Sequence, residues 1–204
     1  MVRVCLVWLV LISAACGGGG GGGGSGIDPR VARLDGYAAM QLRILGDPAI
    51  GRPAMPKTDA ANVPAAGTAT YTGGASILVA LPDSSLSLFG DANLTVDFNL
   101  HSVDGEVLRV FGQTPAGNVA DYQGVLALDG LLDDGAMMLA YTGRLSAGGT
   151  GLDFDGVIAA HLLGASATAF AGGDLDARIL QNGTVRDGAI TIFGEGRVQP
   201  PATP

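Results

Sequence analysis

An alternation of apolar and polar residues is the feature that most restricts how this chain can fold. It is clearest in DANLTVDFNL (residues 91–100), where every second residue is apolar and the residues between are Asp, Asn or Thr. Successive side chains of a β-strand point to opposite faces, so a period of two predicts a strand with one buried face. The apolar residues from Ala92 to Leu100 are therefore expected to point together into a core.

Less regular alternation recurs later, in residues 122–128, 137–141 and 190–198. Dipeptides that favour turns lie among these segments: Asp104-Gly105, Asp129-Gly130, Asp134-Gly135, Asn182-Gly183 and Asp187-Gly188. Asn and Asp tolerate positive φ and Gly adopts it freely, so such pairs suit tight hairpins. We therefore expect about eight strands between residues 68 and 199.

Short connections let consecutive strands pair, so the expected fold is all-β, an eight-stranded antiparallel up-and-down β-barrel over residues 67–199. Closure into a barrel removes the two unpaired sheet edges. The 34 glycines agree with this fold, because Gly weakens helix interiors but is useful at turns and barrel bends. The apolar residues suffice to fill the interior with side chains, and an open sandwich is the alternative.

One amphipathic helix is expected before the barrel, over residues 29–45. Asp28 can cap it, Pro29 suits its first turn, and Gly46 stands where helices commonly end. Apolar residues recur at intervals of three and four: Val31, Leu34, Ala38, Leu42 and Leu45. This stripe could plug the barrel or lie against its wall. Residues 47–67 have no periodicity, so 28–66 is interpreted as a helix and a linker.

Residues 1–15 are typical of an export signal. Arg3 supplies a positive start, residues 4–12 form an apolar run, and residues 13–15 are small, as a signal peptidase requires. The run is shorter than the ~20 apolar residues of a membrane-spanning helix. The signal ends directly before Cys16.

The sequence ISAAC resembles the lipobox of bacterial lipoproteins, in which a Cys is acylated and becomes the new N-terminus. Ser13 departs from it, since Leu is usual there, and an ordinary secretory cleavage site is the alternative. Residues 16–27 are then a lipidated Cys16 and a Gly-rich tether that spans ~18 Å. Gly17 takes the place where Asp retains many lipoproteins in the inner membrane. The resemblance thus implies a lipid anchor in the bacterial outer membrane, on the cell surface or the periplasmic face.

Composition excludes several kinds of chemistry. Cys5 lies within the signal, so beyond Cys16 the mature chain has no cysteine for a disulfide, a thiolate metal site or a nucleophile. The net charge of −8 argues against nucleic acid as a partner. Residues 200–204 are interpreted as a disordered tail.

The remaining candidate catalytic residues also favour a protein that is not an enzyme. His101 is expected in an exposed loop, and His161 at the rim of the barrel. Ser166 lacks the second glycine of a nucleophile elbow. Two pairs of carboxylates, Asp153 with Asp155 and Asp174 with Asp176, alternate with Phe154 and Leu175 as solvent-facing strand positions do. We therefore expect no catalytic, cofactor-binding or metal-binding residue, and no cofactor.

Three stretches resemble the β-barrel domain of transferrin-binding protein B and related surface lipoproteins such as factor H-binding protein. They are YTGGASI (71–77), GDANLTVDFNLHSVDGEV (90–107) and GLDFDGVIAAHLLGASATAFAGG (151–173). The chain lacks the Tyr-Gly-Pro and Glu-x-x-Gly-Gly signatures of that family, so the resemblance implies the barrel and not a transferrin or iron ligand. Family members hold partner proteins with outer loops, and none of their binding residues can be matched here.

The expected function is therefore non-enzymatic binding of a macromolecular partner other than nucleic acid, by a barrel anchored to the outer membrane through Cys16. Two alternatives stay open at this point. One is a carrier whose barrel encloses a small hydrophobic or haem-like ligand, as lipocalins do. The other is a structural envelope lipoprotein.

Overall fold

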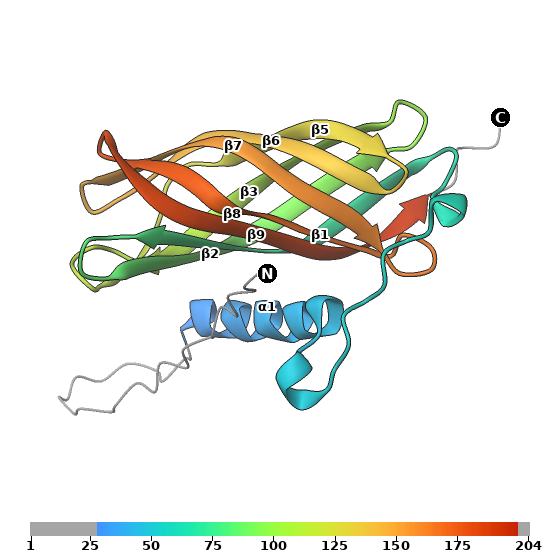
Figure 1. Cartoon of the computed structure of the whole chain (residues 1–204). Coiled ribbons are helices and arrows are strands. Elements are labelled where there is room, and N and C mark those ends of the chain that lie inside the picture. The colour runs from blue at the N-terminus through green and yellow to red at the C-terminus, as the bar shows by residue number, and fades with distance from the viewer. Residues whose placement is uncertain (1–27, 200–204) are drawn as a thin grey trace, which may run out of the picture.

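Residues 28–199 are described by the computed structural model, and most of them form one closed sheet (Figure 1). The strands are β1 (Thr68–Ala80), β2 (Ser85–Asp97), β3 (Ser102–Gln113), β4 (Val119–Asp121), β5 (Leu126–Asp133), β6 (Ala136–Ala147), β7 (Thr150–Leu163), β8 (Ala169–Gln181) and β9 (Thr184–Gln199). Their order is β2-β1-β9-β8-β7-β6-β5-β3-β4, and a further β2–β3 pairing closes the ring. Because β4 only extends the edge beside β3, eight antiparallel strands form the wall, which confirms the expected barrel.

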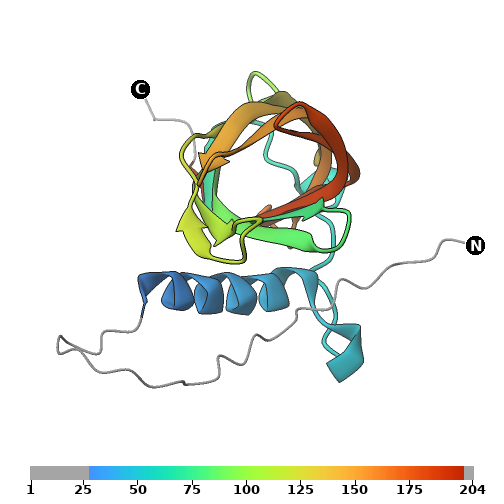
Figure 2. The same ribbon diagram turned by 90° about the vertical axis from the view of Figure 1, so that its left-hand side faces the viewer.

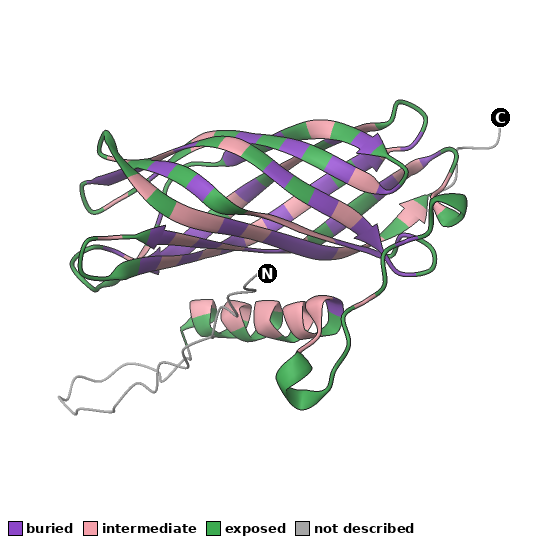
Figure 3. Ribbon diagram, viewed as in Figure 1, coloured by how far each residue is buried: buried purple, intermediate pink, exposed green. Residues whose placement is uncertain are grey.

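The interior of the barrel is filled with apolar side chains, as the alternation predicts. Buried and exposed residues alternate along the strands (Figure 3). Tyr71 and Phe170 are fully buried, and their rings meet edge to face at 5.6 Å between centroids. The Tyr71 hydroxyl donates a hydrogen bond of 2.7 Å to the Ala167 carbonyl, so its polar group is satisfied inside the core. A view along the axis shows the strands surrounding this core (Figure 2).

Only two of the five predicted turn dipeptides are turns. Asp134-Gly135 and Asn182-Gly183 have positive φ at both residues, as tight hairpins require. The prediction is wrong for the others, which lie inside strands: 104–105 in β3, 129–130 in β5 and 187–188 in β9. A Cβ at Gly105 would stand 2.4 Å from a backbone oxygen of the neighbouring strand, and Gly130 and Gly188 are similar. These glycines let strands approach closely within the wall.

Leu100 is a second departure from the alternation. It is 72% exposed, although the period of two predicts that it points into the core. The Asp97 carboxylate accepts hydrogen bonds from the N–H groups of Asn99 and Leu100, and these bonds also lower the pKa of Asp97. A local turn of this kind competes with the strand ladder, so β2 ends at Asp97.

The helix α1 (Pro29–Leu45) has the predicted bounds and lies against the outside of the barrel (Figures 1 and 2). The Asp28 carboxylate caps it by accepting from the Arg30 N–H at 2.9 Å. The predicted apolar stripe coincides with the docking face only in part: Leu45 packs in the cluster between helix and barrel, whereas Val31 is 46% exposed. Side chains of α1 that interact with the barrel include Arg30, Arg33, Tyr37, Met40, Arg43 and Ile44. The docking face is thus partly polar, because the wall beneath it supplies carboxylates.

Two glycines of this region are expected to respond oppositely to alanine. Gly36 lies inside α1 with open space around a Cβ, so Gly36→Ala should stabilise the helix by about 0.5–1 kcal/mol. Gly46 has φ +67°, and a Cβ there would stand 2.5 Å from backbone atoms of residues 52–54, so Gly46→Ala should destabilise the protein. Urea unfolding midpoints of the two variants test this, and shifts of the same sign would contradict it.

The segment between α1 and β1 runs to the end of the barrel where β7 finishes (Figure 1). It contains two short 3-10 helices, Pro48–Ile50 and Ala60–Asn62. The buried Thr58 hydroxyl donates to the Gly164 carbonyl at 2.7 Å, so this linker is packed in place. Within residues 28–199, no helix combines the length and the apolar character needed to cross a bilayer.

Candidate binding groove between the helix and the barrel

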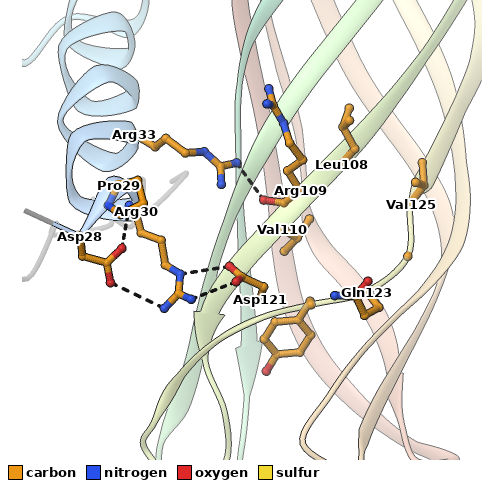
Figure 4. A pocket seen from close by; sticks show the side chains of 12 residues that line it. Asp28, Pro29, Arg30, Arg33, Leu108, Arg109, Val110, Asp121, Gln123 and Val125 are labelled. Carbon is orange, nitrogen blue, oxygen red and sulfur yellow. Dashed lines mark hydrogen bonds and ion pairs between the residues drawn. The ribbon is translucent and has the colours of Figure 1, made fainter. Parts of the chain in front are cut away.

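An open groove of about 800 Å³ lies between the N-terminal half of α1 and the wall formed by β3, β4 and the loop that follows β4 (Figure 4). Leu108, Val110 and Val125 supply apolar lining from the barrel. Arg30 and Arg33 line it from the helix. The groove therefore combines an apolar wall with charged groups, as binding sites commonly do.

Arg30 ties the start of the helix to β4. Its guanidinium donates to both carboxylate oxygens of Asp121, at 3.0 Å from Nε and 2.9 Å from Nη2. Two parallel bonds of this kind fix orientation as well as distance. The pair is partly exposed, so its net stabilisation is small. Its main effect is to position the two sides of the groove.

Asp91 is the centre of a second, more buried network behind the groove. Its carboxylate accepts a short hydrogen bond from the Tyr37 hydroxyl and another from Arg33 at 3.3 Å, and it forms an ion pair with Arg109. Asp91 Oδ2 is buried, and the Arg109 guanidinium that forms an ion pair with it offsets its charge. Burial, followed by the bond to Asp91, raises the pKa of Tyr37 to about 12.

A β-bulge in β3 shapes this network. Asp91 of β2 pairs with Leu108, whereas Phe89 pairs with Phe111, so β3 has one extra residue between these pairs. Arg109 has φ +50° there, which costs a non-glycine residue about 1–2 kcal/mol. Its carbonyl accepts from Arg33 at 2.8 Å. Bulges redirect groups of a strand, and this one turns a backbone acceptor toward the helix.

The Tyr37 ring packs against Gly74 of β1. A Cβ at this position would stand 2.8 Å from the Tyr37 ring and 3.0 Å from the Phe193 ring. The Arg33 guanidinium lies 4.7 Å from the centroid of Phe111, within range of a cation–π interaction. The helix is thus held by the Tyr37 ring packed against Gly74 and by the Asp91 carboxylate, which accepts hydrogen bonds from Tyr37 and Arg33.

Loss of the Asp91 carboxylate is expected to release α1. Asp91→Ala would leave Arg33 and Tyr37 without their shared acceptor. We expect this to weaken docking of the helix by about 2 kcal/mol, which is less than the loss of a fully buried ion pair costs because Arg109 is exposed. That energy corresponds to about a 30-fold larger population of undocked helix. Limited proteolysis within α1 measures this population. Asp35→Ala, at an exposed position of the same helix, is the matched control and should leave the rate unchanged.

A second depression, of about 520 Å³, lies on the other side of β4. It shares Asp121 and Gln123 with the groove and continues to the hairpin between β6 and β7, at Gly148 and Gly149. Arg144 on its border pairs with Asp153 at 3.0 Å. The two depressions together form one concave surface around the short strand β4.

The two histidines and Ser166 lie apart from this surface. His101 is exposed in the turn after β2, as expected for a loop residue. His161 near the end of β7 contacts Lys57, with 2.7 Å between Nε2 and Nζ, and burial followed by the Lys57 charge lowers its pKa. Ser166 is exposed in the β7–β8 turn, which is followed by a strand and not by the helix that a nucleophile elbow requires. In residues 28–199, no three His, Cys, Asp or Glu side chains form a group suited to a metal ion.

The paired aspartates divide into two cases. Asp153 and Asp155 flank the buried Phe154, as the alternation predicts. In the second pair, the alternation predicts that Leu175 between the two aspartates is buried, and this is wrong. Leu175 is 71% exposed because β8 has a bulge between Asp174 and Ala177. Asp174 is partly buried and accepts from the Tyr141 hydroxyl at 2.7 Å, whereas Asp176 is exposed.

The residues of the groove were not identified from the sequence. Arg30 and Asp121 are 91 residues apart, and Arg33 and Asp91 are 58 apart, so no local pattern connects them. One signal was present: Arg30, Arg33 and Tyr37 are spaced by three and four, which places them on one face of a helix. Cys16 lies outside the described residues.

Comparison with known proteins places the barrel among similar solved structures. No protein-family model matches the chain, and no curated protein matches it. Two mutants of the vaccine antigen transferrin binding protein B from Haemophilus parasuis Hp5 are similar, at 16% and 17% identity and a TM-score of 0.49 each. The matches cover 70% of this chain and 29% and 28% of theirs. The barrel resembles that of transferrin-binding protein B.

Intact Ap-TbpB, with its N and C lobes, is a third similar structure, with 14% identity and a TM-score of 0.49. That match covers 70% of this chain and 28% of the other. The chain therefore spans less than a third of the length of these transferrin-binding proteins.

Proposed function

We propose that this protein is a non-enzymatic lipoprotein, anchored in the bacterial outer membrane through Cys16, that binds a macromolecular partner on the outer surface of its barrel. The observation that carries the proposal is the concave surface around β4, where an apolar wall meets charged groups from α1. The helix that forms one side is held by Asp91 and Asp121, so the surface is largely preformed. Preformed surfaces bind with a smaller entropic cost.

The filled interior supports binding on the outside rather than carriage within. Both depressions described above lie on the outer surface of the barrel. Inward-facing positions are occupied by large buried side chains such as Tyr71, Tyr141 and Phe170. A carrier of the lipocalin type needs an interior space of some hundreds of Å³. The carrier alternative therefore has no support from the packing of the barrel.

Photo-crosslinking on intact cells tests the proposed surface. A benzophenone amino acid at Gln123, which borders both depressions, is expected to give a discrete adduct of higher mass. The same amino acid at Asp83, in the exposed β1–β2 turn, is the control and should give none. Identical adducts from both positions, or an adduct from neither, would contradict binding at this surface.

A further inference from the structure

A separate apolar surface lies on β5, β6, β7 and β8. Leu131 of β5 pairs with Met138 of β6, and Met138 pairs with Ala159 of β7. Ala140 of β6 pairs with Val157 of β7. Ala159 pairs with Gly173 of β8, and Leu175 follows Gly173 by two residues, where the β7–β8 register shifts. We call these residues the apolar band: Leu131, Met138, Ala140, Val157, Ala159 and Leu175.

The large side chains of the apolar band are exposed. The exposed fractions are 67% for Leu131, 59% for Met138, 48% for Val157 and 71% for Leu175. Figure 1 shows β5, β6 and β7 on the side of the barrel away from α1, so the helix does not cover them. Single exposed apolar residues are ordinary, but a contiguous group across four strands marks an interaction surface.

Carboxylates surround the apolar band. Asp129 pairs with Ala140, and Asp104 of β3 is directly opposite Asp129. Asp155 precedes Val157 by two residues, and Asp176 follows Leu175. All four are exposed, and none forms an ion pair within the described part of the chain. Like charges directly opposite each other destabilise a sheet, so the Asp104–Asp129 pair gives the isolated barrel no advantage.

We propose that the apolar band binds a basic amphipathic segment of a partner protein, with Lys or Arg side chains of that segment pairing with the surrounding carboxylates. Charge complementarity selects this occupant. A second copy of the chain would bring the same acidic border and a net charge of −8. The inference is independent of the groove, because the band lies on β5–β8 and the groove on α1, β3 and β4.

The test uses a 14-residue amphipathic peptide of Leu and Lys, labelled with a fluorophore, and the full chain with Cys16→Ala so that no detergent competes. Two control peptides have the same composition in scrambled order, or Glu in place of Lys. The parent protein should bind the amphipathic basic peptide more tightly than either control. Equal binding of the scrambled peptide would overturn the proposal, and so would equal binding of the acidic one.

Variants locate the binding on the protein. Leu131→Thr with Met138→Thr should weaken binding at least tenfold, about the loss of one strong contact. Asp104→Asn with Asp129→Asn should weaken it about threefold and reduce its salt dependence. Controls of matched chemistry are Ile50→Thr with Val185→Thr, and Asp59→Asn with Asp83→Asn, all at exposed positions elsewhere. Unchanged affinity in the band variants overturns the proposal.

Two further measurements separate the alternatives. Removing the like-charge pair should keep or raise the Tm of the Asp104→Asn, Asp129→Asn variant, so weaker peptide binding cannot be ascribed to unfolding. Sedimentation of the parent protein tests self-association, and a dimer that Leu131→Thr dissociates would overturn the proposal. A failure of crosslinking at Gln123 would contradict binding at the groove only. It would not change the peptide-binding or sedimentation results expected for the apolar band.

Discussion

Replacing Cys16 with alanine is expected to move the protein from the membrane fraction to the soluble fraction almost completely. The acyl chains of a lipoprotein contribute about 0.8 kcal/mol for each buried CH₂ group, so one sixteen-carbon chain supplies about 10 kcal/mol. Within residues 28–199 no helix is long and apolar enough to cross a bilayer, and the net charge of −8 repels anionic lipids. Fractionation and the mass of the mature N-terminus measure the change.

Cys5 provides the matched control for this experiment. It lies within the export signal, so Cys5→Ala should leave both the fractionation and the mature mass unchanged. Ser13→Leu restores the residue that is usual in the lipobox and should increase the processed, acylated fraction. If Cys16→Ala and the parent have the same mature mass apart from the substitution, the chain is an ordinary secreted protein.

The barrel and the helix could be predicted because their signals are local. Alternation between Ala92 and Phe98 reports one buried face, and Asp28 with Gly46 marks the ends of α1. The turn prediction failed at glycines such as Gly105, which let two strands approach closely. Glycine is used both for this close approach and for the positive φ of a turn, so its presence does not tell the two apart. The two uses cannot be separated without knowing which strand lies alongside.

The binding surfaces depend on contacts that the sequence does not display. Tyr37 faces the barrel because Gly74 leaves room for its ring and Asp91 accepts a hydrogen bond from its hydroxyl, and both residues lie far along the chain. The alternation placed Leu175 inside the barrel, and the bulge in β8 moved it to the surface. A one-residue insertion reverses the direction of a strand side chain, so a single bulge is enough to create an exposed apolar residue.

Stability is expected to fall steeply above pH 10, because every tyrosine of the chain is held in its protonated form. Burial is the largest cause in each case: it raises the pKa of Tyr37 to about 12 and also raises the pKa values of Tyr71, Tyr122 and Tyr141. A folded-state pKa above the unfolded value means that the stabilisation is complete below pH ~10 and is lost as the pH rises above it. At pH 11, each tyrosine that stays protonated in the fold costs about 1.4 kcal/mol.

Urea unfolding at pH 8 and pH 11 measures this loss, which is about 4 kcal/mol if three of the four tyrosines resist ionisation. That is a large part of the 5–15 kcal/mol typical of a domain. Tyr71→Phe should lower stability at pH 8, because the Ala167 carbonyl loses its donor, but should also reduce the difference between the two pH values. The chain has a single lysine, Lys57, so few other groups titrate in this range. Absorbance at 295 nm measures ionisation of the native tyrosines. If they ionise near pH 10 and the urea midpoint does not change, the core does not keep their hydroxyls protonated.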